Sequence, residues 1–490
     1  MGLAAAGAAV TRPLIGEAEA RPASRDGFLS AARLEAWQRD LDGMDLRATA
    51  SRAHERYIDV LHERLARVGV RHLRLERVPI RRWTPQRWSL ELLSGSDVAR
   101  LPVVSYIPYS GRTDSGGISG RLAILEEGET PAPGSLAGAV VLFRLSPQLI
   151  PNPALKTIAY RVYDPRDVLS NGGTFQRWQP GRARLVLDQL EASGAAAAVG
   201  ILDLPPDAAV SGYYPYDGVL RSVPGVYVDR ATGERLKAAA RGGGSARVTL
   251  TAKVERTSSR NLIGLIPGAS RELMILNSHT DGPNAIEDNG PNAIVAMSRQ
   301  LARLPRRSLP RTILISLTTG HFHGAAGQEA FLSRHRRDLV PRTAAALTVE
   351  HLGALQWRTG AERSALTGHY EPGLFFAPEV SALVNAAYAA AARAKAGPTL
   401  VSRPITEAPI ARDRKGFPAE GSRLWTHGGI PTANFIAGPM YLFNFGQSTM
   451  DKFSAPLMRA QAIAFTRMLL QLSHVPRKRL RRLDLLSGGG

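Results

Sequence analysis

The sequence has 490 residues and no cysteine, which leaves room for two or three domains but excludes disulfides, cysteine nucleophiles and thiolate zinc sites. Hydrophobic residues make up 44% and charged residues 21%, as in a folded globular protein, and no apolar run approaches the ~18 residues of a membrane span. The formal net charge is +20, but the basic residues are scattered and the aromatic residues, at 6%, are not interleaved with them, which argues against nucleic-acid binding.

The two ends of the chain differ from the rest in composition. Residues 1 to 27 are rich in small side chains and predict a disordered or targeting-like segment that lacks the basic start of a complete signal peptide. Residues 476 to 490 form a basic tail. These ends leave two locations open, the cytoplasm and export from the cell.

The first folded segment, residues 28 to 109, begins with helical and continues with β patterning. Tyr57 and Leu61 belong to a series of apolar residues at helical spacing, whereas residues 73 to 93 alternate as a strand does. The next segment, residues 110 to 255, has its own succession of strands and helices. We predict that this segment folds as a smaller inserted α+β domain.

Strands and helices alternate again between residues 256 and 475. The strands are predicted at 272–278, 312–318, 345–351 and 432–438, with helices between them. This alternation predicts a mixed, mostly parallel sheet with helices on both faces. The fold class is therefore α/β, with a three-layer α/β/α core that combines residues 28 to 109 and 256 to 475 around the insertion.

Side chains that can bind a metal ion follow these predicted strands. His279 and Asp281 come after the first strand, Glu287 and Asp288 precede the next helix, His321 and His323 follow the second strand, and Glu350 and His351 end the third. Because the carboxyl ends of parallel strands meet at one edge of a sheet, we expect these groups to converge. Imidazole and carboxylate together favour zinc. Asp281, two residues beyond His279, is expected to orient that imidazole.

The order of these segments resembles that of the M28 family of zinc aminopeptidases and carboxypeptidases. The stretches NSHTDG, EDNGPNAI, HFHGAAGQEAF, VEHLGAL and GGIPTANFIAGPMYL stand in the order of that family's metal-ligand and catalytic segments. Residues 110 to 255 resemble a protease-associated (PA) domain, with GAVVLFRL and VPGVYVD among its elements. The resemblance covers residues 45 to 470 and implies a zinc-dependent hydrolase.

Carried over residue by residue, the resemblance implies a metal site of His279, Asp288 and Glu350. If the register slips by one residue, Glu287 takes the place of Asp288. His321 stands where the family has its general-base glutamate.

At two other positions where the family has metal ligands, this sequence has side chains that cannot bind metal. Phe322 stands at a second-zinc ligand, and Leu442 or Phe443 stands at the final histidine ligand. One zinc ion is therefore expected rather than two. The family's SDH-like segment falls on residues that begin with Glu420.

Two interpretations of these departures remain open. In the first, a single zinc ion and His321 as base cleave a peptide or another amide-type bond, while His323, His351 or Glu420 replaces a ligand or contacts the substrate, and Tyr441 lines the pocket. In the second, the chain is a catalytically inactive pseudoenzyme that serves as a binding or scaffold module. The metal content of the protein separates the two.

Overall fold

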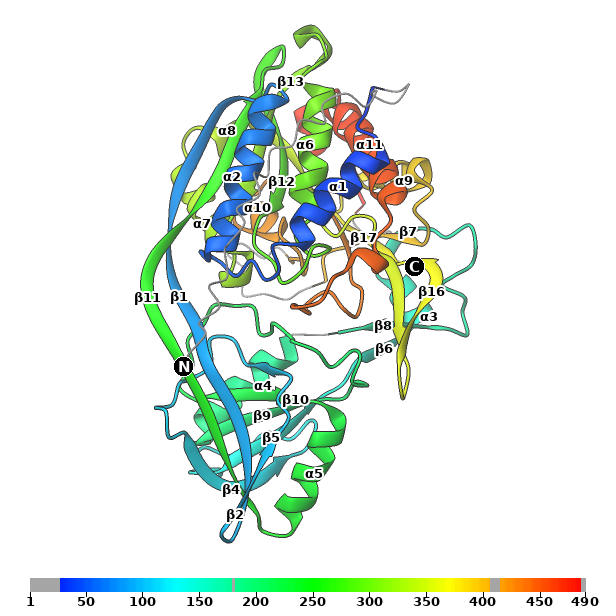
Figure 1. The fold of residues 1–490 in the computed structure, drawn as a ribbon. Helices are drawn as coiled ribbons and strands as arrows, with labels where there is room; N and C mark the ends of the chain where they lie inside the picture. Colours follow the sequence, from blue (N-terminus) through cyan, green and yellow to red (C-terminus); the bar gives the residue numbers. More distant parts are fainter. Residues whose placement is uncertain (1–26, 179–180, 406–414, 486–490) are drawn as a thin grey trace, which may run out of the picture.

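The computed structural model describes residues 27–178, 181–405 and 415–485, so the N-terminal segment predicted at residues 1–27 lies outside the described residues except for Gly27. Its main feature is a mixed sheet of 15 strands with helices on both sides (Figure 1). Parallel strands form two blocks in this sheet, and antiparallel strands join and border the blocks. The predicted mixed α/β fold is confirmed.

Two long antiparallel strands, β1 (Arg71–Ser94) and β11 (Ser245–Ile266), connect the two blocks (Figure 1). Their pairing runs from Arg71 opposite Leu265 to Leu93 opposite Ser245. β11 pairs with β13 (Arg311–Thr318) near one end and with β4 (Ile118–Leu125) at the other. The boundary predicted after residue 255 therefore falls inside a continuous strand.

The first block is built from the predicted insertion. Its parallel strands are β4, β5 (Val140–Leu145), β9 (Ala197–Leu202) and β10 (Gly225–Val228), with β3 (Ser105–Tyr106) antiparallel at the edge and with helices α4 (Gly181–Ala192) and α5 (Arg230–Arg241). Side chains alternate between the faces of the strands. Phe143 clusters with Leu187 of α4, and Leu142 clusters with Leu236 of α5, so each face has its own apolar core.

Residues 148 to 177 leave the first block and pack against the second. They form β6 (Gln148–Pro151), α3 (Asn152–Thr157), β7 (Ala159–Tyr163) and β8 (Thr174–Arg177). β7 pairs with β18 (Thr399–Ser402) at the edge of the sheet. Phe175 of β8 lies in one cluster with Leu374 and Phe376 of β17 (Gly373–Phe376). Part of the predicted insertion thus contributes directly to the second block.

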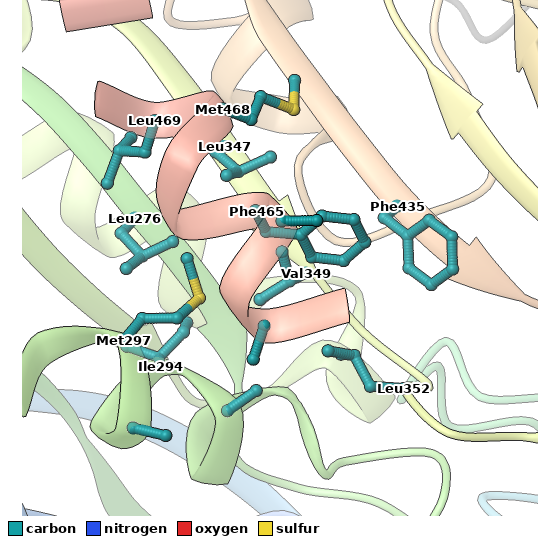
Figure 2. Close-up of a cluster of buried hydrophobic side chains, with 14 of the residues drawn as sticks. Leu276, Ile294, Met297, Leu347, Val349, Leu352, Phe435, Phe465, Met468 and Leu469 are labelled. Atoms are coloured by element: carbon teal, nitrogen blue, oxygen red, sulfur yellow. The ribbon is translucent and has the colours of Figure 1, made fainter. Parts of the chain in front are cut away.

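The second block contains the parallel strands β13, β12 (Ser270–His279), β14 (Thr343–Val349) and β19 (Thr432–Ala437). One face packs against α1 (Ala31–Asp42), α2 (Arg52–Arg67), α6 (Gly290–Leu301), α9 (Ser381–Ala394) and α11 (Ala455–Ser473). Figure 2 shows Phe465 and Leu469 of α11 near Leu276 and Leu347 of the strands. α7 (Ala326–Arg334) and α10 (Ser422–Thr426) cover the other face, which completes the three predicted layers.

The remaining elements are short. They are β2 (Asp97–Leu101), β15 (Leu355–Thr359), β16 (Ser364–Tyr370), α8 (Leu339–Arg342), α12 (Arg477–Leu480) and the 3-10 helices η1 (Arg306–Ser308), η2 (His321–His323) and η3 (Met450–Lys452). α12 lies within the predicted basic tail. None of the described helices has both the length and the apolar character needed to cross a membrane.

Candidate metal centre

Five of the metal-capable side chains predicted from the sequence meet at the carboxyl edge of the second block. His279 ends β12, and Glu350 and His351 follow β14 directly. His321 begins η2, which follows β13, and Glu287 lies in the loop before α6. Parallel strands bring their carboxyl ends to one edge, which is why segments far apart in the chain converge there.

Each of the three imidazoles is oriented through its Nδ1 atom. In His279 this atom lies 2.9 Å from the backbone oxygen of Asp281. In His351 it lies 2.5 Å from the backbone oxygen of Ala437, and in His321 it lies 2.7 Å from Glu420 Oε2. Oxygen acceptors at these positions place a proton on every Nδ1, so each ring directs its Nε2 atom inward.

The inward Nε2 atoms face two buried carboxylates. His279 Nε2 lies 3.3 Å from Glu350 Oε2 and 3.6 Å from Glu287 Oε1. His351 Nε2 lies 3.8 and 3.7 Å from the same two oxygens. His321 Nε2 is 4.0 Å from Glu287 Oε1. We call these five residues the His–Glu cluster.

Neighbouring groups fix Glu350 within the cluster. Its Oε1 atom accepts hydrogen bonds from the backbone N–H of Glu420, at 3.1 Å, and from Asn434 Nδ2, at 2.8 Å. The other carboxylate oxygen of Glu350 is therefore left to face His279. Glu420 is held in turn by a hydrogen bond from the Thr318 hydroxyl.

Asp288, predicted as a metal ligand, is bound by an arginine instead. Arg47 donates to both oxygens of Asp288, from Nε at 2.5 Å and from Nη2 at 2.8 Å. Neither side chain is exposed to solvent. The structure thus brings Glu287, the neighbouring carboxylate, to the cluster, and keeps Asp288 behind it.

Asp281 serves the site in a different way from the one predicted. Its backbone oxygen, rather than its carboxylate, orients His279. The carboxylate accepts hydrogen bonds from the backbone N–H groups of His321 and Phe322, both at 3.1 Å, and from Thr49 Oγ1 at 2.5 Å. Asp281 therefore holds the first turn of η2 against the end of β12.

Two other predicted residues do not join the cluster. The His323 ring packs 5.4 Å from the Tyr109 ring and against Gly218, where an added Cβ would come within 2.3 Å of Nδ1. The Tyr441 hydroxyl donates to the backbone oxygens of Leu355 and Lys452, at 3.0 and 3.3 Å. Tyr441 is a buried structural residue at this edge rather than a side chain that faces the imidazoles.

Comparison with known proteins gives a structural match only. No family model matches the sequence, and no curated protein matches it. Among solved structures, a peptidase M28 precursor from Shewanella amazonensis SB2B aligns with a TM-score of 0.62 at 14% identity, over 91% of this chain and 96% of that chain. BSAP, a zinc aminopeptidase from Bacillus subtilis, has a TM-score of 0.62 at 14% identity over 91% and 94%. The aminopeptidase from Aneurinibacillus sp. strain AM-1 has a TM-score of 0.56 at 15% identity over 91% and 93%. The chain has the M28 peptidase-like fold.

Within the M28 peptidase-like fold, an aromatic side chain that sequence reasoning did not single out covers the cluster. Tyr216 comes from the predicted insertion and stacks on His321, with ring centroids 5.8 Å apart and planes at 17°. Its ring also stacks on Phe443 at 5.3 Å and 13°. No local pattern marks Tyr216, because its role depends on how the insertion lies against the second block.

Burial and mutual charge set the pKa values of the cluster. Burial alone would lower the pKa of His279, but Glu287 and Glu350 outweigh it and raise that pKa well above its usual value. Burial raises the pKa of Glu287 well above normal. For Glu350, contact with His279 outweighs burial and lowers the pKa to about 2. Burial lowers the pKa of His351 to about 4. A proton on His279 supplies the positive charge that the buried carboxylates demand, and a bound metal cation would replace it.

The spacing and the unsatisfied atoms of the cluster fit a metal ion. Zinc bonds of about 2.0–2.1 Å place tetrahedral ligand atoms roughly 3.3 Å apart. The four distances from His279 and His351 to the two carboxylates lie between 3.3 and 3.8 Å. None of the described residues hydrogen-bonds to His279 Nε2, His351 Nε2 or Glu287 Oε2, although all three atoms are buried. Buried polar atoms without partners are costly unless a ligand satisfies them.

Proposed function

We propose that this protein is a metal-dependent hydrolase that cleaves peptide or other amide-type bonds. The observation that carries the proposal is the convergence of three Nε2 atoms on two buried carboxylates, with every Nδ1 already engaged. Zinc is the expected ion because the donors are imidazole nitrogens and carboxylate oxygens. When bound, zinc supplies a Lewis acid and lowers the pKa of a water molecule to about 7.

One ion suits this site better than two. The cluster contains two groups of closely spaced ligand atoms, His279 with Glu287 and His321, and His279 with Glu350 and His351. Both groups depend on His279, whose Nδ1 is already engaged by a backbone oxygen. A single free Nε2 lone pair can bind only one ion. We assign His279, Glu350 and His351 as ligands because all three are buried, and we place Glu287 beside them.

His321 is the residue we propose as general base. It is the most accessible member of the cluster, with 14% of its side chain exposed. Glu420 binds its Nδ1 atom and so fixes the tautomer whose Nε2 can accept a proton. The same carboxylate then stabilises the imidazolium that forms. Glu420 acts through His321 and is a positioning residue.

Metal content and hydrolysis together test the proposal. Chelator-stripped protein reloaded with zinc should contain about one zinc per chain by elemental mass spectrometry, and His279→Ala should contain none. His321→Ala should keep zinc and lose hydrolysis of aminoacyl and peptide substrates. His323→Ala is the matched control, since His323 occupies the same 3-10 turn outside the cluster and its loss should change neither readout.

Two outcomes would reject parts of this proposal. Zinc bound without hydrolysis of any substrate would favour the pseudoenzyme interpretation, in which the M28 peptidase-like fold serves as a binding or scaffold module. Failure of wild-type protein to bind zinc would remove the metal site itself.

A further inference from the structure

The amino edge of the second block concentrates basic residues. Three segments, 267–272, 302–311 and 334–343, lead into β12, β13 and β14, and a fourth, 475–484, follows α11. Fourteen of their 36 residues are Lys or Arg and three are Asp or Glu, whereas the whole chain has 62 and 42 in 490 residues. Basic residues that look scattered along the sequence thus gather at one edge of the sheet, with more than half of the net charge of +20. We call these four segments the basic face.

Arginine side chains hold the C-terminal segment against two of the others. Arg477 donates to the backbone oxygen of Pro341, and Arg481 Nη2 donates to the backbone oxygen of Thr343 at 3.0 Å. Arg311 donates to the backbone oxygen of Ser473, at 2.7 Å, where α11 ends. The segment that contains α12 is therefore part of the folded surface.

Further arginines join the remaining segments. Arg342 Nε lies 2.9 Å from the backbone oxygen of Arg271, and Arg306 Nε lies 2.7 Å from that of Gly268. Each hydrogen bond crosses from one segment to another. All four segments are thereby in contact, and their charges belong to one continuous surface.

Much of the positive charge on the basic face has no acidic partner. Exposed side chains without an ion pair or a side-chain hydrogen bond to any described residue include Arg271, Arg303, Arg307, Arg337, Lys478 and Arg479. The acidic residues of the face are already engaged, Glu272 by Arg311, Asp338 by His335 and Asp484 by the amino end of α9. Water solvates any one of these basic groups, but their concentration on one face creates a positive potential that a scattered distribution would not.

The residue types on the basic face favour lipid headgroups over nucleic acid. None of the 36 residues is Phe, Trp or Tyr, so the face has no such ring on which a base could stack. Its α-helices α8 and α12 have four residues each, too few to read a DNA groove. Leu483, which is 40% exposed, directly follows Arg481 and Arg482. A basic surface with an exposed aliphatic side chain suits an anionic bilayer, which offers phosphate groups and an apolar interior together.

We infer that the basic face binds the surface of an anionic lipid membrane. The His–Glu cluster lies at the opposite, carboxyl edge of the same strands, and the ten residues of β12 separate the two edges by roughly 30 Å. Figure 1 shows the start of β13 at the end of the second block that lies away from the first block. Binding through the basic face therefore directs the cluster away from the membrane. This inference does not depend on the proposed hydrolase function.

Vesicle sedimentation tests the inference on the full-length protein. The vesicles consist of phosphatidylcholine alone or of phosphatidylcholine mixed with phosphatidylglycerol. At physiological salt, wild-type protein should bind the mixed vesicles at least ~10-fold more tightly than the neutral ones, and high salt should abolish the difference. The fourfold variant Arg307→Gln/Arg337→Gln/Lys478→Gln/Arg479→Gln should lose at least ~10-fold in affinity for the mixed vesicles, because each basic group near an anionic membrane contributes roughly five-fold.

A second fourfold variant has the same net charge and is the matched control. It replaces by glutamine four exposed arginines of the first block and the connecting strands, Arg81, Arg100, Arg121 and Arg256. This control should bind the mixed vesicles nearly as wild-type protein does, because its substitutions leave the basic face intact. Thermal unfolding of both variants checks their folding. If the first variant does not fold, Lys478→Gln/Arg479→Gln, confined to α12, should still weaken binding more than the control does.

Three outcomes would overturn the inference. The first is equal affinity of wild-type protein for neutral and mixed vesicles. The second is an equal loss of affinity in the two fourfold variants, which would mean that net charge rather than the basic face attracts the vesicles. The third is binding of duplex DNA without binding of vesicles, which would assign the face to nucleic acid if the first variant lost it. A loss confined to the first variant supports the inference even if no bond is hydrolysed.

Discussion

Arg47 binds both carboxylate oxygens of Asp288 in an ion pair that is completely buried. The pair connects the segment before α2 to the loop that carries Glu287. Backbone hydrogen bonds between Arg47 and Gly282, at 2.9 and 3.2 Å, reinforce the same connection. Both Asp288 oxygens are thereby occupied, and the loop presents its other carboxylate to His279.

This arrangement predicts opposite effects for substitutions of two adjacent carboxylates. Asp288→Ala leaves Arg47 buried without a partner and should lower the free energy of unfolding by about 3–5 kcal/mol. Folded Asp288→Ala should nevertheless retain zinc. Glu287→Gln keeps the shape of the side chain but removes a charge from the cluster, so it should weaken zinc binding and leave Arg47 paired.

Urea unfolding and elemental mass spectrometry at matched protein concentration measure both effects. A folded Asp288→Ala variant without zinc, together with full zinc content in Glu287→Gln, would falsify the placement of Glu287 beside the ion and favour Asp288 as a ligand.

Glu420→Gln tests the positioning of the proposed base. The amide cannot hold the imidazolium form of His321 as the carboxylate does, so kcat should fall by about 10²- to 10⁴-fold. Zinc content should change little, because the contact of Glu420 with Glu350 is made by its backbone N–H. A fall in kcat with unchanged KM and unchanged zinc content separates this role from a purely structural one.

The sequence could predict the strands and the residues at their ends, because both depend on local patterns. Hydrophobic runs mark β12 and β14, and His279 and Glu350 follow from the strand-end rule. Arg47 could not be predicted as the partner of Asp288, since 241 residues separate them.

The choice between Glu287 and Asp288 depends on how a loop turns, which hydrophobic spacing does not encode. Gly282 marks this turn, because a Cβ there would come within 2.3 Å of Glu287 Oε2. Tyr216 reaches the site from the predicted insertion, and only the assembled fold brings it beside His321.

The ion pairs of Asp203 with Arg144 and Arg230 predict that the stability of the first block depends on pH. Burial alone would raise its pKa, but hydrogen bonds from Arg144 and Arg230 outweigh burial and lower it. Arg230 Nε lies 2.6 Å from Asp203 Oδ1. A lowered folded-state pKa means that this stabilisation is present above the unfolded pKa of about 3.9 and is lost as the pH falls through the folded value.

Asp203→Asn should therefore lower the free energy of unfolding at pH 7 and have progressively less effect below about pH 4. Urea titrations at pH 7 and pH 3 measure the difference. Asp229→Asn is the matched control, because asparagine caps α5 as well as aspartate does and should change stability little at either pH. If Asp203→Asn lowered the free energy of unfolding equally at both pH values, packing rather than charge would link Asp203 to the two arginines.

The stack of Tyr216 on His321 predicts that the insertion covers this proposed base in solution. Its ring stacks on both His321 and Phe443, so Tyr216→Ala removes two aromatic pairs and should lower the free energy of unfolding by about 1–3 kcal/mol. Tyr216→Phe keeps both pairs and should resemble the wild type. Ring-current shifts report the stack directly, because the carbon-bound protons of His321 should move downfield in Tyr216→Ala but not in Tyr216→Phe. Unchanged His321 resonances in Tyr216→Ala would mean that Tyr216 does not stack on His321 in solution. His321 would then be accessible to substrate without any movement of the insertion.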